Sequence, residues 1–256
     1  MSLHTLRPPV DGQPPLLLLH AFPLDHRMWA AAAAAVPSPR GVLAADLPDR
    51  SGPLPSVSSL DAAADALADE LAQAGVARVV VAGISMGGYL ALALVERHPE
   101  VVAGLGLVDT RAAADSHEAA QRRRDMAHEL LAAGTVDAVR PMASTLLGET
   151  TRVARPALVA EVAGWIGEQS PEVVAWCQRA MAARPDRTEV LAGFGGPVAI
   201  LVGDEDTLTG VEAARTMAQV AGDAQLVVIP GAGHLSAVED PAAVGLALAE
   251  LAIRAD

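Results

Sequence analysis

The sequence predicts an α/β fold: a doubly wound, mostly parallel sheet that carries a helical cap insertion. Three observations lead to this prediction. Short apolar runs bounded by Gly, Pro or Asp alternate with longer, alanine-rich segments, which is typical of βαβ units in a parallel sheet. The runs are apolar at consecutive positions, as expected for strands that helices cover on both faces. One long stretch between two such runs shows only helical patterns.

Six apolar runs have the length of buried strands and end at turn-forming residues. Each is followed by a candidate helix or by the long helical stretch, so the chain returns to the same sheet after every excursion. We expect strands at residues 15–20, 41–46, 78–83, 103–109, 197–203 and 225–230.

The segments between these runs are expected to be helices, and two of them carry clear patterns. Residues 60–74 place four apolar side chains on one stripe and aspartates on another, as in a helix that packs one face against a sheet. Residues 86–98 are apolar nearly all round, which indicates a buried helix, and they end before Pro99. The full set of expected helices is 26–36, 60–74, 86–98, 211–220 and 241–254.

Residues 111–194 break this rhythm, because they contain no convincing strand. Their helical pattern is interrupted several times by Gly and Pro. We therefore expect an α/β core of residues 1–110 and 195–256, with residues 111–194 forming a cap, or lid, over the carboxyl edge of the sheet. Large apolar side chains from the cap, with Phe22 from the core, are candidates to line a substrate pocket: Trp165, Trp176, Met126 and Met181.

The composition excludes several classes of protein. None of the 256 residues is lysine or asparagine, and 18 arginines against 31 acidic residues leave a formal net charge of −13. Without lysine there is no Schiff-base, pyridoxal-phosphate or P-loop chemistry, and without asparagine there is no N-glycosylation. A negative chain without a basic stripe argues against nucleic acid and anionic membranes as partners.

The expected location follows from the cysteine content and the N-terminal residues. The single cysteine, Cys177, cannot form an internal disulfide, which favours a reducing compartment. Residues 1–15 contain no apolar segment of the kind found in signal sequences, and residues 16–19 are too few to span a membrane. We therefore expect a soluble, cytoplasmic protein.

A candidate nucleophile lies between an expected strand and an expected helix. Residues 83–88 read GISMGG, a G-x-S-x-G pattern in the strand–turn–helix setting where it has mechanical meaning. The tight turn holds Ser85 in a strained backbone conformation, and its neighbours must be glycine because a Cβ would strike the adjacent strand or helix. The turn exposes the Ser85 hydroxyl at the carboxyl edge of the sheet. The alternative is a Gly-rich turn with an incidental serine.

A serine needs a base, and His234 is the best placed of the seven histidines. It lies in the loop PGAGHL that follows the last expected strand, so it reaches the same sheet edge as Ser85. The other candidates close a helix, lie in the helical insertion or have no distinctive setting: His98, His117, His128, His4 and His26.

The histidine in turn needs an acid to fix its tautomer. Asp206, in the loop GDED after the strand at 197–203, is the first choice because the third residue past the glycine can turn back toward His234. Asp109 also ends an expected strand and is its rival. An oxyanion formed by attack on a carbonyl needs two preorganised donors. The backbone N–H groups of Met86 and Phe22 are the candidates.

Ser85, Asp206 and His234, in this chain order and on these loops, resemble the α/β-hydrolase fold family over almost the whole chain. Residues 19–25, LHAFPLD, look like its H-G-F-P oxyanion loop, and residues 46–48, DLP, look like its D-L-P-G turn. Residues 231–234, GAGH, with Glu239 and Pro241 after them, are similar to the histidine loop of the family.

Two further motifs resemble one branch of the family, the 3-oxoadipate enol-lactonases and related small carboxylesterases: DTR at residues 109–111 and AMAARPD at residues 180–186. The chain departs from the family pattern at Ala21 and Asp49, where glycine is usual, and at Gly210, where proline is common. These departures remove no catalytic group but can change the shape of the pocket. Ser85 excludes the branches that carry aspartate as the nucleophile.

The resemblance implies a serine hydrolase of carboxylic esters or lactones that forms an acyl-enzyme and acts on a small-molecule substrate. No metal or organic cofactor is implied, because the histidines are not spaced as a zinc set and Cys177 has no second thiolate. The same fold also serves cofactor-free haloperoxidases or perhydrolases, C–C hydrolases and biosynthetic cyclases, which stay open as alternatives. A non-catalytic ligand-binding protein is the third class.

Overall fold

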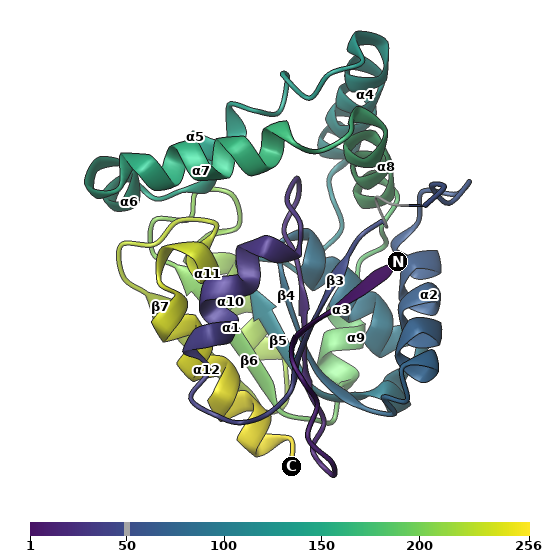
Figure 1. Cartoon of the computed structure of the whole chain (residues 1–256), viewed down its shortest axis with the longest axis vertical. Helices are drawn as coiled ribbons and strands as arrows, with labels where there is room; N and C mark the ends of the chain where they lie inside the picture. The colour runs from purple at the N-terminus through teal and green to yellow at the C-terminus, as the bar shows by residue number, and fades with distance from the viewer. Residues whose placement is uncertain (49–51) are drawn as a thin grey trace.

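The computed structural model describes residues 1–48 and 52–256. Within this part of the chain the strands are β1 (Ser2–Arg7), β2 (Leu16–Leu19), β3 (Val42–Asp46), β4 (Val79–Ile84), β5 (Val102–Val108), β6 (Val198–Gly203) and β7 (Ala224–Ile229). They form one sheet in the order β1-β3-β2-β4-β5-β6-β7 (Figure 1). Strands β2 to β7 are parallel to their neighbours, and β1 pairs antiparallel with β3. The predicted α/β class with a mostly parallel sheet is confirmed.

Each of the six expected strands is present, with both ends within one residue of the expectation. The seventh, β1, was not expected. Its sequence SLHTLR has no run of consecutive apolar residues, and its side chains are only partly buried. An edge strand needs apolar residues on one face only, so it lacks the pattern that identifies a strand covered on both faces.

The helices of the core cover both faces of the sheet (Figure 1). On one face α1 and α12 pack against each other, and α12 contacts β4, β5 and β6. On the other face α3 contacts β2, β4 and β5, with α2 and α9 packed against α3 and with α10 against β6 and β7. Helix α9 (Thr188–Gly193) falls within residues 111–194, which are expected to form the cap, but it packs against α3 and α10. The other helices beside the sheet are η1 (His26–Trp29), α1 (Ala30–Ala35), α2 (Leu60–Gln73), α3 (Met86–Arg97), η2 (Pro99–Val101), α10 (Gly210–Val220), α11 (Ser236–Glu239) and α12 (Pro241–Arg254).

Helix α3 shows why its sequence is apolar on every side. It lies at the centre of its layer, between β2, β4 and β5 below and α2 and α9 beside it. All residues from Met86 to Val95 are buried. Because a helix enclosed on all sides has no solvent-facing stripe, an all-round apolar sequence is the expected pattern for it.

Between β5 and β6 the chain forms a group of helices above the carboxyl edge of the sheet (Figure 1). The described residues of this segment contain no strand. Helices α4 and α8 pack against each other, whereas α5 and α6 pack against α7. These helices are α4 (His117–Ala133), α5 (Met142–Leu146), α6 (Glu149–Ala154), α7 (Pro156–Gly167) and α8 (Pro171–Ala182).

Candidate active site

Ser85 occupies the sharp turn between β4 and α3. Its backbone has φ 53° and ψ −113°, in the positive-φ region that L-residues rarely adopt. The turn is tight because its glycines lie against backbone: a Cβ on Gly83 would lie 2.1 Å from the carbonyl oxygen of Gly87, and a Cβ on Gly87 would lie 2.1 Å from that of Leu19. The Ser85 amide donates to the Val108 carbonyl at 2.9 Å. The neighbouring strands therefore hold the turn in place.

His234 lies between Ser85 and Asp206. Its Nε2 atom is 2.8 Å from Ser85 Oγ, and its Nδ1 atom is 2.9 Å from Asp206 Oδ2. The side chains of His234 and Asp206 are 4% and 0% exposed. An ionised carboxylate can only accept, so the Nδ1 proton is directed to Asp206 and the Nε2 lone pair is left to accept from the serine hydroxyl. This arrangement allows a proton to move from Ser85 to His234.

Asp206 is held as a carboxylate by its loop. It accepts from the Leu208 amide at 2.8 Å, from the Thr209 amide at 3.1 Å and from the Thr209 hydroxyl. Burial raises the pKa of Asp206, but the hydrogen bond and charge of His234 and the donors of its own loop outweigh burial and hold the pKa well below its usual range. Thr209 was not identified from the sequence, where a threonine three residues after the acid carries no distinctive signal.

Asp109, the rival acid, lies at the end of β5 and has a different set of partners. It is fully buried, with φ 41°. Its carboxyl group accepts from the Gly203 amide at 2.9 Å and the Ser236 amide at 3.0 Å, and lies 2.6 Å from the Ser236 hydroxyl. Burial raises the pKa of Asp109 to about 7, although the charge of His234 opposes this. Asp109 therefore connects the loops that carry Asp206 and His234, while Asp206 contacts the imidazole itself.

Glu239 organises the loop that carries His234. Its buried carboxylate accepts from the amides of Gly233 at 2.8 Å and Leu235 at 3.3 Å, on either side of the histidine. Its other oxygen accepts from the Gly148 amide at 2.9 Å, in the segment between α5 and α6. One side chain thus joins the histidine loop to the helices above it. The sequence indicated Glu239 only as part of the family motif.

The loop that carries Phe22 follows β2, so it leaves the sheet at the same carboxyl edge as Ser85. Among the backbone hydrogen bonds of the described residues outside helices and strands, none has the N–H of Phe22 or of Met86 as its donor. His20 anchors this loop: its Nδ1 donates to the Ala21 carbonyl at 2.9 Å, and its Nε2 accepts from the Leu47 amide at 2.9 Å. Burial lowers the pKa of His20, which keeps the imidazole neutral as these two bonds require.

The predicted pocket residues have varied surroundings. Phe22 is 5% exposed, and Trp176 is buried with its indole N–H donating to the Pro55 carbonyl at 3.1 Å. Trp176 also lines a cavity of about 160 Å³ beside Leu47. The Met181 sulfur is buried near a guanidinium of α4, where that helix packs on α8. Met126 and Trp165 are partly buried and pack against the hydrophobic core.

The departures from the family pattern have distinct local settings. The Ala21 amide faces the Met28 sulfur at 3.2 Å. Gly210 has φ 60°, which proline cannot adopt, so the turn into α10 differs in backbone from a turn that carries proline. Asp49 lies outside the described residues.

Comparison with known proteins places the chain in a family. Residues 16–245 match the model of a family described as the alpha/beta hydrolase family. The chain therefore belongs to the α/β-hydrolase family. No helix among the described residues has both the length and the apolar character needed to cross a membrane.

Individual relatives extend this assignment. A 2-succinyl-6-hydroxy-2,4-cyclohexadiene-1-carboxylate synthase from Enterobacter sp. (strain 638) is 30% identical over 255 residues, covering 94% of this chain and 92% of the synthase. A thermophilic esterase from Thermogutta terrifontis is 34% identical with a TM-score of 0.89, covering 95% of this chain and 89% of the esterase. The enol-lactonase from Burkholderia xenovorans LB400 has a TM-score of 0.79 at 24% identity, and the match covers 95% of this chain and 93% of the enol-lactonase. At this identity the likeness shows only that the two chains share a fold. Family and relatives support a hydrolase activity.

Proposed function

We propose that this chain is a serine hydrolase of carboxylic esters or lactones in which Ser85 is the nucleophile, His234 the base and Asp206 the acid that orients it. One observation carries the proposal. The Ser85 hydroxyl, on a positive-φ turn, lies 2.8 Å from His234 Nε2, and the other ring nitrogen is 2.9 Å from a buried carboxylate. A serine that only stabilises a fold does not need a base aligned by an acid.

The reaction follows from these contacts. His234 Nε2 takes the proton as Ser85 Oγ attacks the ester carbonyl, and Asp206 stabilises the imidazolium through Nδ1. The imidazolium then protonates the leaving alkoxide, and an acyl-enzyme remains on Ser85. Water activated by the same imidazole attacks the acyl carbonyl and releases the acid. The proton taken from Ser85 goes to the leaving alkoxide, and the proton taken from water returns to Ser85. The substrate and water are therefore the only reactants.

The developing negative charge requires donors that are in place before the attack. The N–H groups of Met86 and Phe22 fit this role, because Met86 begins the helix behind the nucleophile and Phe22 lies in the anchored loop after β2. Removal of one such donor typically costs about 2.7–4 kcal/mol of transition-state stabilisation. Both donors belong to the main chain, so side-chain substitution at these positions leaves them present.

The substrate we propose is a small, neutral or weakly acidic acyl compound. The formal charge of −13 disfavours a polyanion, and the esterase relative supports an ester substrate. The cap of residues 111–194 is proposed to form the acyl or ring site, with Phe22, Trp165, Trp176, Met126 and Met181 as its apolar lining. Neither a cofactor nor a metal takes part in the proposed reaction.

The test is turnover of short p-nitrophenyl esters by Ser85→Ala. We expect kcat/KM to fall about 10³-fold or more, together with loss of labelling by a fluorophosphonate probe. Ser144→Ala is the matched control, because Ser144 is an exposed serine of α5. Turnover of wild-type magnitude by Ser85→Ala would overturn the proposal.

A biosynthetic reaction is the second candidate, because the relative that covers 94% of this chain is named a synthase. In such a reaction the same Ser85–His234 pair would act on a carbon acid without an acyl-enzyme. Rapid quenching with p-nitrophenyl acetate followed by mass spectrometry separates the two. An acetyl group on Ser85 that forms and decays at the rate of turnover supports the hydrolase, whereas absence of both p-nitrophenol release and an adduct favours the synthase-type reaction.

A further inference from the structure

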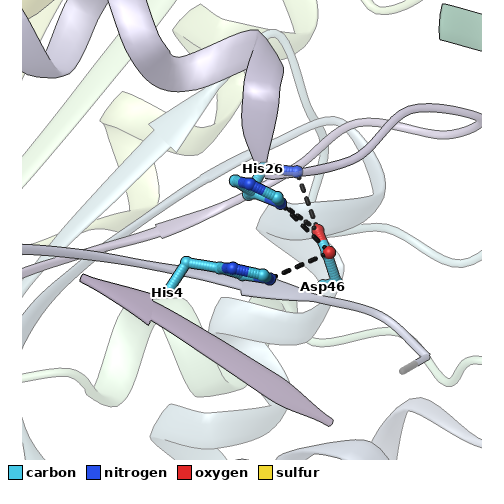
Figure 2. Close-up of side chains that lie close together, drawn as sticks. All are labelled: His4, His26 and Asp46. Atoms are coloured by element: carbon cyan, nitrogen blue, oxygen red, sulfur yellow. Dashed lines mark hydrogen bonds and ion pairs between the residues drawn. The ribbon is translucent and has the colours of Figure 1, made fainter. Parts of the chain in front are cut away.

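A second group of ligand-type side chains lies toward the β1 edge of the sheet, two to three strands away from the nucleophile. His4 is on the edge strand β1, His26 begins η1 directly after the loop that carries Phe22, and Asp46 ends β3. Figure 2 shows the two imidazoles directed at one carboxylate. In the described part of the chain these three residues form a group whose ligand atoms all lie within 4.8 Å of one another. Nothing in the proposed hydrolysis uses them.

The contacts within this group are short, and both imidazoles contact the Asp46 carboxylate. His4 Nε2 lies 3.0 Å from Asp46 Oδ2, and His26 Nδ1 lies 3.0 Å from both carboxylate oxygens. The two rings are stacked, with centroids 3.6 Å apart and planes 13° from parallel. Asp46 is also fixed by the His26 amide, which donates to Oδ1 at 2.8 Å.

We propose that His4, His26 and Asp46 bind one divalent transition-metal ion of the zinc type. Two imidazole nitrogens and a carboxylate oxygen are ligands that such an ion prefers. Metal–ligand distances of about 2.1 Å at a tetrahedral angle separate two ligand atoms by about 3.4 Å. The observed nitrogen–oxygen separations of 3.0 Å are therefore a few tenths of an ångström from those of a bound ion.

The burial of the three side chains suits an ion that enters from solvent. The side chain of Asp46 is 7% exposed, whereas those of His4 and His26 are 32% and 23% exposed. Stacked imidazoles direct their lone pairs nearly in parallel, so the rings must rotate apart at the edge that faces Asp46 to share an ion. Their partial exposure leaves room for this rotation and for water as the remaining ligand.

A bound ion would connect three elements that are otherwise joined by hydrogen bonds. It would tie β1 and β3 to η1, and η1 follows the loop in which Phe22 presents its amide. Because an ion binds the folded chain and not the dispersed ligands of the unfolded chain, binding stabilises the fold. We expect a structural ion whose removal leaves Ser85, His234 and Asp206 in place.

The test uses the full chain without a histidine tag, freed of metal by EDTA and then titrated with Zn²⁺ or Co²⁺ in a calorimeter. We expect one ion per chain, with His4→Gln and His26→Gln each weakening binding about tenfold or more. Glutamine can still donate to Asp46 but is a poor ligand for these ions. His128→Gln is the matched control, because His128 is exposed on α4. Absence of saturable binding, or equal binding by all variants, would overturn the proposal.

A measurement on the wild-type chain keeps the test valid if a variant folds poorly. Zn²⁺ at a hundredfold excess over its Kd should raise the melting midpoint by roughly 5 to 10 °C. Co²⁺, which is paramagnetic, should broaden the imidazole NMR signals of His4 and His26 more strongly than those of the other five histidines. Broadening centred on other histidines, or an unchanged midpoint, would count against the site.

Discussion

His234 Nε2 and Ser85 Oγ lie 2.8 Å apart, although 149 residues separate them in the chain. The sheet brings them together because Ser85 directly follows β4 and His234 lies in the loop after β7, and both strands run parallel. The carboxyl ends of parallel strands meet at one edge, so loops from distant parts of the sequence converge there. The same edge carries Asp206 after β6 and Asp109 after β5.

The two aspartates should differ sharply in their effect on turnover. Asp206→Asn is expected to lower kcat by about 10² to 10⁴-fold, because an amide opposite Nδ1 favours the tautomer that cannot accept the serine proton. Asp109→Asn should lower kcat by less than about tenfold, since its contacts are with Gly203 and Ser236. Steady-state kinetics on p-nitrophenyl esters measures both. The reverse order would identify Asp109 as the acid.

Asp109 should make the stability of the chain depend on pH. Its pKa is about 7 in the folded chain, above the value of about 3.9 for an unfolded aspartate. Between these two values the folded chain holds more protons than the unfolded chain, so the stability present at low pH is lost as the pH rises toward 7.

The loss expected from pH 5 to pH 8 is about 2 to 3 kcal/mol of unfolding free energy. Asp109→Asn cannot ionise and should lack this part of the pH dependence, even if it is less stable at every pH. Urea unfolding of both proteins at a series of pH values gives the comparison. Parallel curves for wild type and variant would show that Asp109 does not titrate in this range.

Gly87, two residues after Ser85, should tolerate no side chain. Gly87→Ala places a Cβ 2.1 Å from the Leu19 carbonyl oxygen, so β2 and α3 must move apart at a cost of about 3 kcal/mol or more. Gly164→Ala is the control, because this exposed glycine of α7 has nothing within 4 Å of the added Cβ. It should stabilise the chain by about 0.5–1 kcal/mol. Thermal unfolding of the two variants distinguishes close packing from a general effect of alanine.

Glu239 should affect both stability and catalysis through the histidine loop. Glu239→Gln replaces one acceptor oxygen by an NH₂ group that faces a backbone N–H, which is expected to cost about 1–3 kcal/mol. With His234 less firmly placed, kcat should fall more than KM changes. Glu250→Gln, at an exposed site on α12, is the control for loss of charge. An effect confined to KM would point instead to the contact of Glu239 with Gly148 between α5 and α6.

The local sequence reveals a strand when every residue of that strand is buried. Strands β2, β4, β5 and β6 are buried at every residue, and such strands must be apolar at every position, which makes them visible as runs. Strand β1 is half-exposed and was not recognisable by this pattern. Ser85 and His234 were identified as candidates because each lies next to a recognisable strand, in a Gly-rich loop whose sequence has a mechanical meaning.

Other features depend on contacts between distant segments. Asp109 and Asp206 both follow strands, and the place of Asp206 in its loop made it the first choice, but its distance from an imidazole on a third loop is not recorded in the local sequence. Asp46 begins the DLP turn, but no local sequence shows that it meets His4 and His26, and only the pairing of β1 with β3 brings His4 and Asp46 together.

The sequence by itself determined the α/β class, the six parallel strands, the helical insertion and the serine and histidine candidates. These features follow from burial on both faces of a strand and from turns that only glycine permits, and both leave a local pattern. Only the tertiary structure decided the contact of Asp206 with His234, the place of Asp109 behind them and the His4–His26–Asp46 group. Those relationships are distances between segments far apart in the chain. They are determined by strand order and packing, which no local pattern records.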